Sequence, residues 1–268
     1  MSEKEASEFG LEVTHNSKVG CAFSLPRSST CIGRTEACTK VCYGNGIRYQ
    51  SVGQKQKRDR NFRTVELLLQ NGGPPLLAQN LVILIDQARP IDWIASTITG
   101  LDTHVPWTFR IHDIGDFHSV EYTEAWTTAV KLRPHCSFWF YTRSFLDEEM
   151  FAVLTELASR PNCKGWLSLD RDNYNEGIIR YCESDPGVWS IALLQEQEDV
   201  MPPEAIPYLS CFSRSGDLLS FPKHHGGRHV APVRADNMMI CPQVTGLYKL
   251  QTAANTPKPC QSCGHCLP

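Results

Sequence analysis

The stretch Trp107-Thr108-Phe109-Arg110-Ile111 alternates large apolar side chains with polar ones and therefore predicts a β-strand. An amphipathic helix is expected after it, from Glu121 to Leu132, with Ser119 as its N-cap. The next strand is expected at residues 137–141, where the side chains are mostly aromatic. This order of strand, helix and strand predicts a parallel α/β sheet.

The same pattern extends on both sides of this segment. Two more strands are expected downstream, at residues 166–169 and 188–194, with a helix at residues 175–182 between them. Upstream, one helix is expected at residues 54–70, and a second begins at Pro74 after a break rich in glycine. The fold class is therefore α/β, although periodicity alone does not distinguish an open sheet from a (βα) barrel.

Three regions are expected along the chain. Residues 1–18 are polar and predict a flexible N-terminal tail, and residues 19–200 carry the alternating strands and helices. Residues 201–268 are rich in proline, glycine and histidine and lose the alternation. An irregular, cysteine-rich C-terminal extension is expected there.

Composition and charge exclude several classes of protein. The formal net charge of −3 over 268 residues does not indicate a nucleic-acid partner, and the longest nearly apolar stretch, Leu76 to Ile85, is too short to cross a bilayer. The first twenty residues lack the basic and apolar segments of a signal peptide. A cytoplasmic protein without membrane contact is expected, so its twelve cysteines favour metal binding over disulfides.

The first cysteine motif is Cys31-x6-Cys38-x3-Cys42, in a loop that also contains Gly33 and Gly44. Glycines allow a loop to fold tightly around a metal centre. Three cysteines can bind three irons of a [4Fe-4S] cluster and leave the fourth iron open to another ligand. The alternatives are three buried cysteines or a zinc site with a fourth ligand from elsewhere.

The second motif is Cys260-x2-Cys263-x2-Cys266, with Cys241 upstream. Spacings of two residues are typical of ferredoxin-type clusters, and four thiolates would complete a closed site. The same four cysteines could bind zinc, because zinc sites also use Cys-x2-Cys pairs. A run of three cysteines favours an iron–sulfur cluster, since a zinc ribbon normally groups its ligands in pairs.

Polar side chains follow each predicted strand. Residues 112–116 follow the first strand, Arg143 follows the second and Asp170 follows the third. Ligands bind at the carboxyl ends of strands in parallel α/β folds, so these residues predict a shared pocket. A separate basic segment at residues 48–63, with six basic residues and one acid, could contact a nucleic acid or could be a solvated helix face.

Several motifs together resemble the phage gene product eighty-eight family. They are Phe23-Ser24-Leu25-Pro26 followed by Cys31, Cys38 and Cys42-Tyr43; Arg110-Ile111-His112-Asp113-x-Gly115-Asp116-Phe117; Phe140-Tyr141-Thr142-Arg143; and the closing cysteines. The likeness runs from about Phe23 to Cys266. The family is similar in layout to radical S-adenosylmethionine (SAM) enzymes, so the resemblance implies a partial or complete parallel (βα) barrel that is radical-SAM-like and carries iron–sulfur clusters.

These observations lead to the expectation of an iron–sulfur enzyme with two [4Fe-4S] clusters, an electron donor as partner and a small-molecule or nucleotide substrate. The first cluster would bind SAM through its open iron, and the second would be auxiliary. The expected catalytic residues are His112, Asp113, Asp116 and Arg143, the cofactor-binding residues are Tyr43, Gly115 and Asp170, and the metal ligands are Cys31, Cys38, Cys42, Cys241, Cys260, Cys263 and Cys266. The alternatives are a Lewis-acid enzyme without SAM and a zinc protein that binds nucleic acid.

Overall fold

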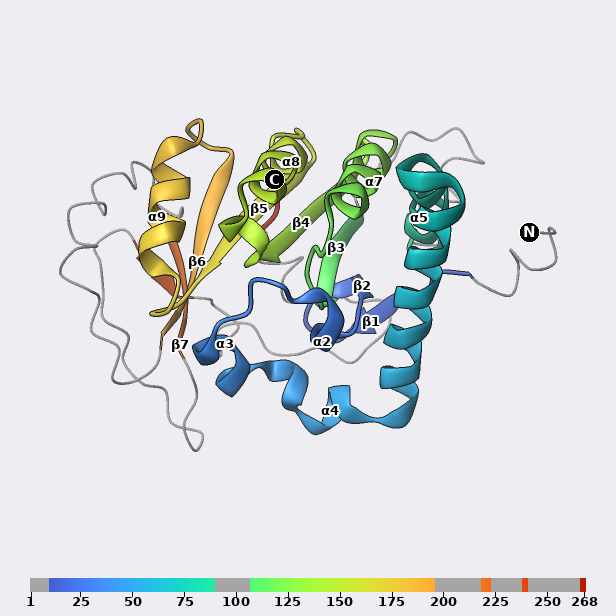
Figure 1. Ribbon diagram of the computed structural model, residues 1–268, viewed down its shortest axis with the longest axis horizontal. Helices are drawn as coiled ribbons and strands as arrows, with labels where there is room; N and C mark the ends of the chain where they lie inside the picture. Colours follow the sequence, from blue (N-terminus) through green and yellow to red (C-terminus); the bar gives the residue numbers. More distant parts are fainter. Residues whose placement is uncertain (1–9, 90–106, 196–217, 223–237, 241–265) are drawn as a thin grey trace.

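The computed structural model describes residues 10–89, 107–195, 218–222, 238–240 and 266–268. Strands and helices alternate along the chain, which confirms the predicted α/β class (Figure 1). The strands are β1 (Thr14–Asn16), β2 (Gly20–Ser24), β3 (Trp107–Ile114), β4 (Cys136–Thr142), β5 (Cys163–Leu169), β6 (Trp189–Gln195), β7 (Leu218–Pro222) and β8 (Met238–Ile240). The helices are α2 (Arg27–Thr30), α3 (Glu36–Val41), η1 (Tyr43–Asn45), α4 (Ile47–Gln50), α5 (Val52–Gln87), α7 (Val120–Lys131), η2 (Ser144–Leu146), α8 (Glu148–Ala158) and α9 (Tyr174–Glu183).

The eight strands form one sheet in which their order follows the chain, from β1 to β8. β1 is antiparallel to β2, and every later pair is parallel. Right-handed crossovers between strands in this order place the connecting helices on the same face of the sheet. Figure 1 shows α5, α7, α8 and α9 side by side, and α7 packs between α5 and α8. Within the described residues no pairing joins β8 to β1 or β2, so the described strands form an open sheet.

The two faces of the sheet bury different partners, because successive side chains of a strand point to opposite faces. Phe138 and Leu167 belong to the large core under the helices. Trp139 and Trp166 point the other way, and Cys266 packs against both of them. The described C-terminal residues therefore lie on the face opposite the helices.

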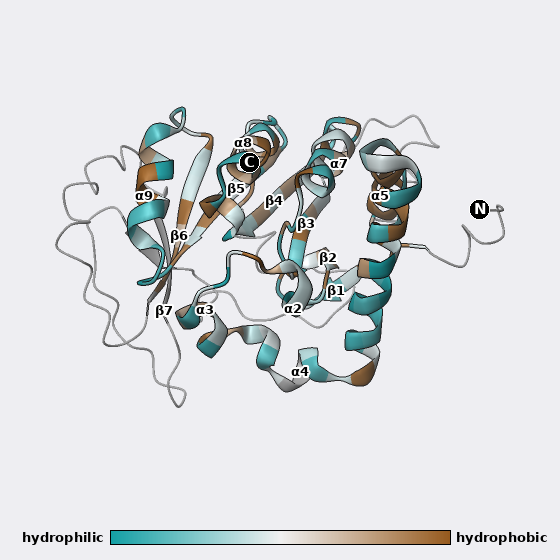
Figure 2. Cartoon of the chain, viewed as in Figure 1, coloured by the Kyte–Doolittle hydropathy of each residue, from teal (hydrophilic) through white to brown (hydrophobic). Residues whose placement is uncertain are grey.

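The helices are amphipathic because their buried residues recur at helical spacing. In α7 these residues include Tyr122, Ala125, Trp126 and Ala129, all fully buried. In Figure 2 the ribbons of α7, α8 and α9 carry both hydrophilic and hydrophobic residues, as amphipathic helices do. Within the described ranges, no helix combines the length and apolar character needed to cross a bilayer.

The break predicted between two upstream helices is confirmed inside α5. Gly73 has a non-helical backbone conformation, with φ 62° and ψ −163°, and Pro74 and Pro75 follow it. Glycine adopts positive φ without the steric penalty of a Cβ atom, and proline is tolerated in the first turn of a helix. The chain can therefore bend here and continue as a second helix.

The structure differs from the expected regions at both ends. Leu11 is buried and β1 pairs with β2, so residues 11–16 of the expected tail belong to the fold. Residues 1–9 of that tail lie outside the described residues. The prediction of an irregular extension after residue 200 is incomplete, because β7 and β8 continue the parallel sheet. Sequence periodicity missed these strands because they are short and separated by long segments.

Candidate functional site

A cavity of about 290 Å³ lies at the carboxyl ends of the parallel strands. One wall of the cavity is the segment after β2, which contains α2, α3 and η1. The ends of β3 and β4 form another part of the lining. Trp139 and Tyr141 contribute to its floor, together with Cys266. This is the edge of the sheet where ligands bind in parallel α/β folds.

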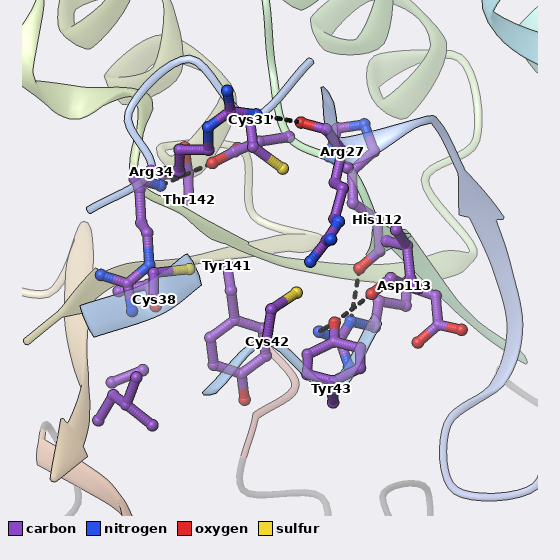
Figure 3. A pocket seen from close by; sticks show the side chains of 18 of the residues that line it. Arg27, Cys31, Arg34, Cys38, Cys42, Tyr43, His112, Asp113, Tyr141 and Thr142 are labelled. Atoms are coloured by element: carbon purple, nitrogen blue, oxygen red, sulfur yellow. Dashed lines mark hydrogen bonds between the residues drawn. The ribbon is translucent and has the colours of Figure 1, made fainter. Parts of the chain in front are cut away.

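Cys31, Cys38 and Cys42 all line this cavity. Cys31 follows the last residue of α2. Cys38 is in the first turn of α3, and Cys42 is the residue directly after this helix, four positions later. Figure 3 shows their three sulfur atoms facing the same space. The structure thus brings together the three cysteines of the first predicted motif.

Thr35 and two aspartates after β5 hold α3 in place. The Thr35 hydroxyl accepts a hydrogen bond from the backbone N–H of Cys38 at 3.0 Å and donates one to Oδ2 of Asp170 at 2.6 Å. Asp172 Oδ2 accepts from the N–H of Ala37 at 2.8 Å. Acidic groups at the N-terminus of a helix also complement its dipole, so the end of β5 fixes the helix that carries Cys38.

Gly33 lets the cysteine loop approach the end of β4. A Cβ atom at Gly33 would lie 1.9 Å from the carbonyl oxygen of Arg143, which is closer than any pair of atoms tolerates. Gly115 meets a similar restriction at the end of β3. Its φ is +95°, and a Cβ atom there would lie 2.8 Å from the Cβ of Leu25 and 2.9 Å from the hydroxyl oxygen of Thr30. Gly115 is therefore a packing and turn residue next to the cavity.

Arg143 connects two buried aspartates. Its Nη1 donates to Oδ2 of Asp170 at 2.5 Å, and its backbone N–H donates to Oδ2 of Asp116 at 2.8 Å. The N–H of Phe117 donates to the other Asp116 oxygen at 2.8 Å. Burial raises the pKa of Asp116 to about 6, although these hydrogen bonds and the Arg143 charge oppose the shift. This network joins the ends of β3, β4 and β5. Asp116 and Arg143 line the cavity, whereas Asp170 is not among the residues that line it.

Asp113 and Tyr43 form a second contact between loop and sheet. The Tyr43 hydroxyl donates to the backbone carbonyl of Asp113, and Asn16 Nδ2 lies 3.1 Å from each Asp113 carboxylate oxygen. Arg110 donates to the carbonyl of His112 at 2.7 Å and to the Tyr43 hydroxyl at 3.5 Å. These bonds place the residue after Cys42 against β3.

The His112 ring points into the core under the helices. Its Nε2 lies 2.8 Å from the hydroxyl of Tyr122, and the ring contacts Phe117 and Trp126. The register between β2 and β3 is irregular here, which turns the ring away from the face that alternation predicts. Burial is the main cause that lowers the pKa of His112 well below its usual value. The positive charges of His118 and Arg110 lower it further. The neutral His112 ring therefore packs on the helix-facing side of β3, near the end of this strand.

The thiols of the loop influence one another. Burial raises the pKa of Cys31, and the neighbouring charges of Asp116, Cys38 and Cys42 raise it further. Burial also raises the pKa of Cys38. Among the residues that the structure describes, no three His, Cys, Asp or Glu side chains are grouped closely enough to hold one metal ion. The cysteines share a cavity without forming a single-ion site.

Of the second cysteine motif, Cys266 alone belongs to the described part of the chain, since Cys241, Cys260 and Cys263 lie outside it. The Cys266 sulfur lies 2.8 Å from the Tyr141 hydroxyl, and its carbonyl accepts from Trp166 Nε1 at 3.4 Å. The last cysteine of the second motif thus lines the same cavity as the first motif.

Several lining residues were missed from the sequence. They are Lys18, Arg27, Arg34, Arg110 and Tyr141. Arg27 and Arg34 lie close to Cys31 in the sequence, and this proximity could have indicated that they line the same cavity. Thr35 was also missed, although a threonine three residues before Cys38 fits the pattern of a helix cap.

Several basic side chains of the segment at residues 48–63 form ion pairs or hydrogen bonds within the chain. Arg60 and Lys57 form ion pairs with Glu12, and Arg58 is buried with its Nη2 donating to the carbonyl of Tyr49 at 2.8 Å. These three side chains are therefore less available to phosphate groups. Contact with a nucleic acid through this segment stays a prediction, and the contacts of Lys57, Arg58 and Arg60 do not favour it.

Comparison with known proteins shows the family to which the chain is related. The Gene 88 protein of Mycobacterium phage L5 is 28% identical over 178 residues, which cover 65% of this chain and 66% of the relative. The Gene 88 protein of Mycobacterium phage D29 is 27% identical over 173 residues, which cover 63% of this chain and 64% of the relative. The chain thus spans slightly less than two thirds of the length of each. No solved structure matches the chain. The family described as Gene product 88 matches residues 2–268, and the chain therefore belongs to the Gene product 88 family.

Proposed function

We propose that this chain is an iron–sulfur enzyme whose catalytic cluster is bound by Cys31, Cys38 and Cys42. The observation that carries the proposal is the convergence of these three thiols on one cavity at the carboxyl ends of parallel strands. A loop of three cysteines at this edge is suited to bind three irons of a cubane and to leave the fourth iron facing the cavity.

Three thiols that line one cavity are the type of donor that an iron–sulfur cluster requires. A zinc site brings its ligands to about 2.3 Å from one atom, and the described residues contain no group arranged closely enough for this. The thiolates of a cubane bind different irons and stand farther apart. The pKa values of Cys31 and Cys38 are raised by burial, so a positively charged centre in the cavity would stabilise the thiolate forms that bind metal.

The fold proposed for this activity is a partial (βα) barrel of the radical-SAM-like type. The support is the sequential order of the strands, which an open sheet of this kind shares with part of a barrel. A reduced cluster would supply the electron that cleaves SAM, and this chemistry belongs to the cofactor. SAM would bind in the cavity in front of the cysteine loop.

The protein's own residues would position the loop and shield the reaction. Asp170 and Thr35 hold the helix of Cys38, and Tyr43 holds the residue after Cys42 against β3. Arg143 and Asp116 join the strand ends below the loop. In this proposal Arg143, Asp116 and Asp170 are positioning residues, and His112 supports β3 from the core side. An auxiliary cluster would use Cys266 with Cys241, Cys260 and Cys263.

The proposal is tested by incubating the anaerobically purified protein with SAM and dithionite and measuring 5′-deoxyadenosine by mass spectrometry. Wild type is expected to form it, and Cys38→Ala is expected to form none. If wild type contains iron and sulfide but neither binds nor cleaves SAM, the radical mechanism is wrong and the open iron acts as a Lewis acid instead. Stoichiometric zinc without iron would exclude both iron-based mechanisms.

A further inference from the structure

A fourth cysteine, Cys266, lines the cavity that Cys31, Cys38 and Cys42 face. The first three come from the segment after β2, and the fourth comes from the C-terminal end of the chain. The cavity has a volume of about 290 Å³, close to the lower end of the usual range for ligand pockets, so a group bound there contacts several of its walls. Four thiols from two distant parts of the sequence therefore share one small space.

The sheet holds Cys266 in this position. The carbonyl oxygen of Cys266 accepts a hydrogen bond from Trp166 Nε1 at 3.4 Å, and the residue packs against Trp166, Ala192 and Trp139. Both tryptophans are buried. Since they belong to β4 and β5, Cys266 is placed by the same sheet whose carboxyl edge carries the cavity.

Tyr141 contacts the sulfur of Cys266 and favours a form that binds metal. The Tyr141 hydroxyl oxygen lies 2.8 Å from this sulfur. When the sulfur is a thiolate, the O–H group must be the donor, and a hydrogen bond to the charged form stabilises it. The thiolate is the form of cysteine that binds metal, and a hydrogen bond from an outer residue to a metal ligand is a common way to orient it. The contact with Tyr141 is therefore compatible with metal binding by Cys266.

The first cysteine motif leaves one coordination position that needs a ligand. Three thiolates bind three irons of a cubane, and thiolate is the ligand type that such clusters prefer. Among the described residues that line the cavity, Cys266 is the one further cysteine. The two carboxylates of the lining are engaged elsewhere: Asp113 accepts from Asn16 on both oxygens, and Asp116 accepts from two backbone N–H groups. Cys266 is thus the best suited of the lining side chains to supply the fourth ligand.

We infer that Cys266 is the fourth thiolate of the first metal site, where it binds the iron that the loop cysteines leave open until SAM displaces it. The exchange needs no oxidant or reductant, because the sulfur keeps both electrons of the bond that breaks and the incoming ligand supplies its own pair. The displaced thiolate keeps its hydrogen bond from Tyr141. The inference rests on the proposed function for the presence of the cluster, and it moves Cys266 from the auxiliary set to the first site.

The test measures how fast iodoacetamide alkylates Cys266 in the anaerobically purified, full-length protein, by peptide mass spectrometry. Iron and sulfide are measured on the same sample. Cys266 of wild type should react at least about tenfold more slowly than exposed Cys182, because its nucleophilic electron pair is bound to iron. Cys163 is buried in β5 and reports on folding, since it should stay unmodified in every folded variant.

Two variants decide which site protects Cys266. The triple variant Cys31→Ala, Cys38→Ala, Cys42→Ala removes the first site, and Cys260→Ala removes a ligand of the auxiliary set. Alkylation of Cys266 should become at least about tenfold faster in the triple variant and stay slow in Cys260→Ala. The inference is overturned if Cys266 stays protected in the triple variant, or if Cys260→Ala exposes it while the loop cysteines stay protected.

Addition of SAM to wild type is a second measurement that requires no variant to fold. Alkylation of Cys266 should become faster, and alkylation of Cys38 should stay slow because this thiolate remains bound. Protection that depends on the loop cysteines but is unchanged by SAM would contradict SAM binding and leave Cys266 as the fourth ligand. Wild type without iron would contradict the proposed function, and this inference with it. Iron-loaded protein in which the protection of Cys266 follows Cys260 would contradict the inference alone.

Discussion

The hydroxyl oxygen of Tyr141 lies 2.8 Å from the sulfur of Cys266, although the two residues are 125 positions apart in the chain. Tyr141 also lines the cavity that Cys31, Cys38 and Cys42 face. The contact therefore connects the end of the second cysteine motif with the site of the first. The two motifs are far apart in the chain, and the fold brings at least this one residue of the second to the cavity of the first.

Tyr141→Phe is expected to expose the thiol of Cys266. The substitution keeps the ring on the floor of the cavity and removes one hydrogen bond, which contributes about 1 kcal/mol and corresponds to about a fivefold change in rate. In metal-free protein, alkylation of Cys266 by iodoacetamide, followed by peptide mass spectrometry, should be faster by that factor. Cys182, which is exposed on α9, serves as the internal control and should react at an unchanged rate. Equal rates at Cys266 in both proteins would show that the contact does not hold the C-terminus.

Thr35→Ala is expected to destabilise the cysteine loop. The change removes the N-cap of α3 and leaves Asp170 without one of its hydrogen-bond donors, so the free energy of unfolding should fall by about 1–2 kcal/mol. Urea denaturation measures this loss. Thr39→Ala is the matched control, since Thr39 is exposed on the same helix and should change stability by less than about 0.5 kcal/mol. Equal effects of the two substitutions would argue against the cap.

Gly33→Ala is expected to displace the loop from β4. The added methyl group would meet the Arg143 carbonyl, and overpacking of this kind lowers stability by about 1–3 kcal/mol. Gly53→Ala is the control, because nothing lies within 4 Å of a Cβ there and alanine favours a helix. Thermal unfolding should therefore show a lower Tm for the first variant and an unchanged or higher Tm for the second. A Gly33→Ala protein as stable as wild type would mean that the loop packs differently.

The sequence predicted the fold class and the first cysteine motif because both have local signals. Strands such as β4 show aromatic runs, and the three cysteines are close together in the chain. The roles of Tyr141 and Cys266 could not be predicted, since their contact depends on which face of the sheet the C-terminus covers. The orientation of the His112 ring could not be predicted either, because no sequence pattern indicates the irregular register between β2 and β3 beside it. Pairing of β7 and β8 depends on long-range contacts that periodicity does not report.

His112 is expected to make the protein less stable in acid. Its pKa is lowered in the folded state by burial and by the charges of His118 and Arg110, and it has a Tyr122 hydroxyl beside it. The unfolded state binds the proton near pH 6.5, so stability falls as pH drops below that value, by at most about 1.4 kcal/mol per pH unit. Asp116 acts in the opposite direction, since its pKa is raised to about 6 in the fold. The comparison is therefore made between wild type and His112→Gln in urea at pH 7 and pH 5. The variant should lose less stability on acidification, and equal losses would contradict a neutral buried imidazole.

The central claim is that Cys31, Cys38 and Cys42 bind an iron–sulfur cluster, and metal analysis of anaerobically purified protein tests it most directly. Iron, acid-labile sulfide and zinc are measured in wild type and in the Cys31→Ala, Cys38→Ala, Cys42→Ala triple variant, with Cys182→Ala as the control. Wild type should contain about four more iron atoms and four more sulfides per chain than the triple variant. The control should match wild type, because Cys182 is exposed on α9 and does not line the cavity. Equal iron in wild type and the triple variant, or zinc in place of iron, would contradict the account.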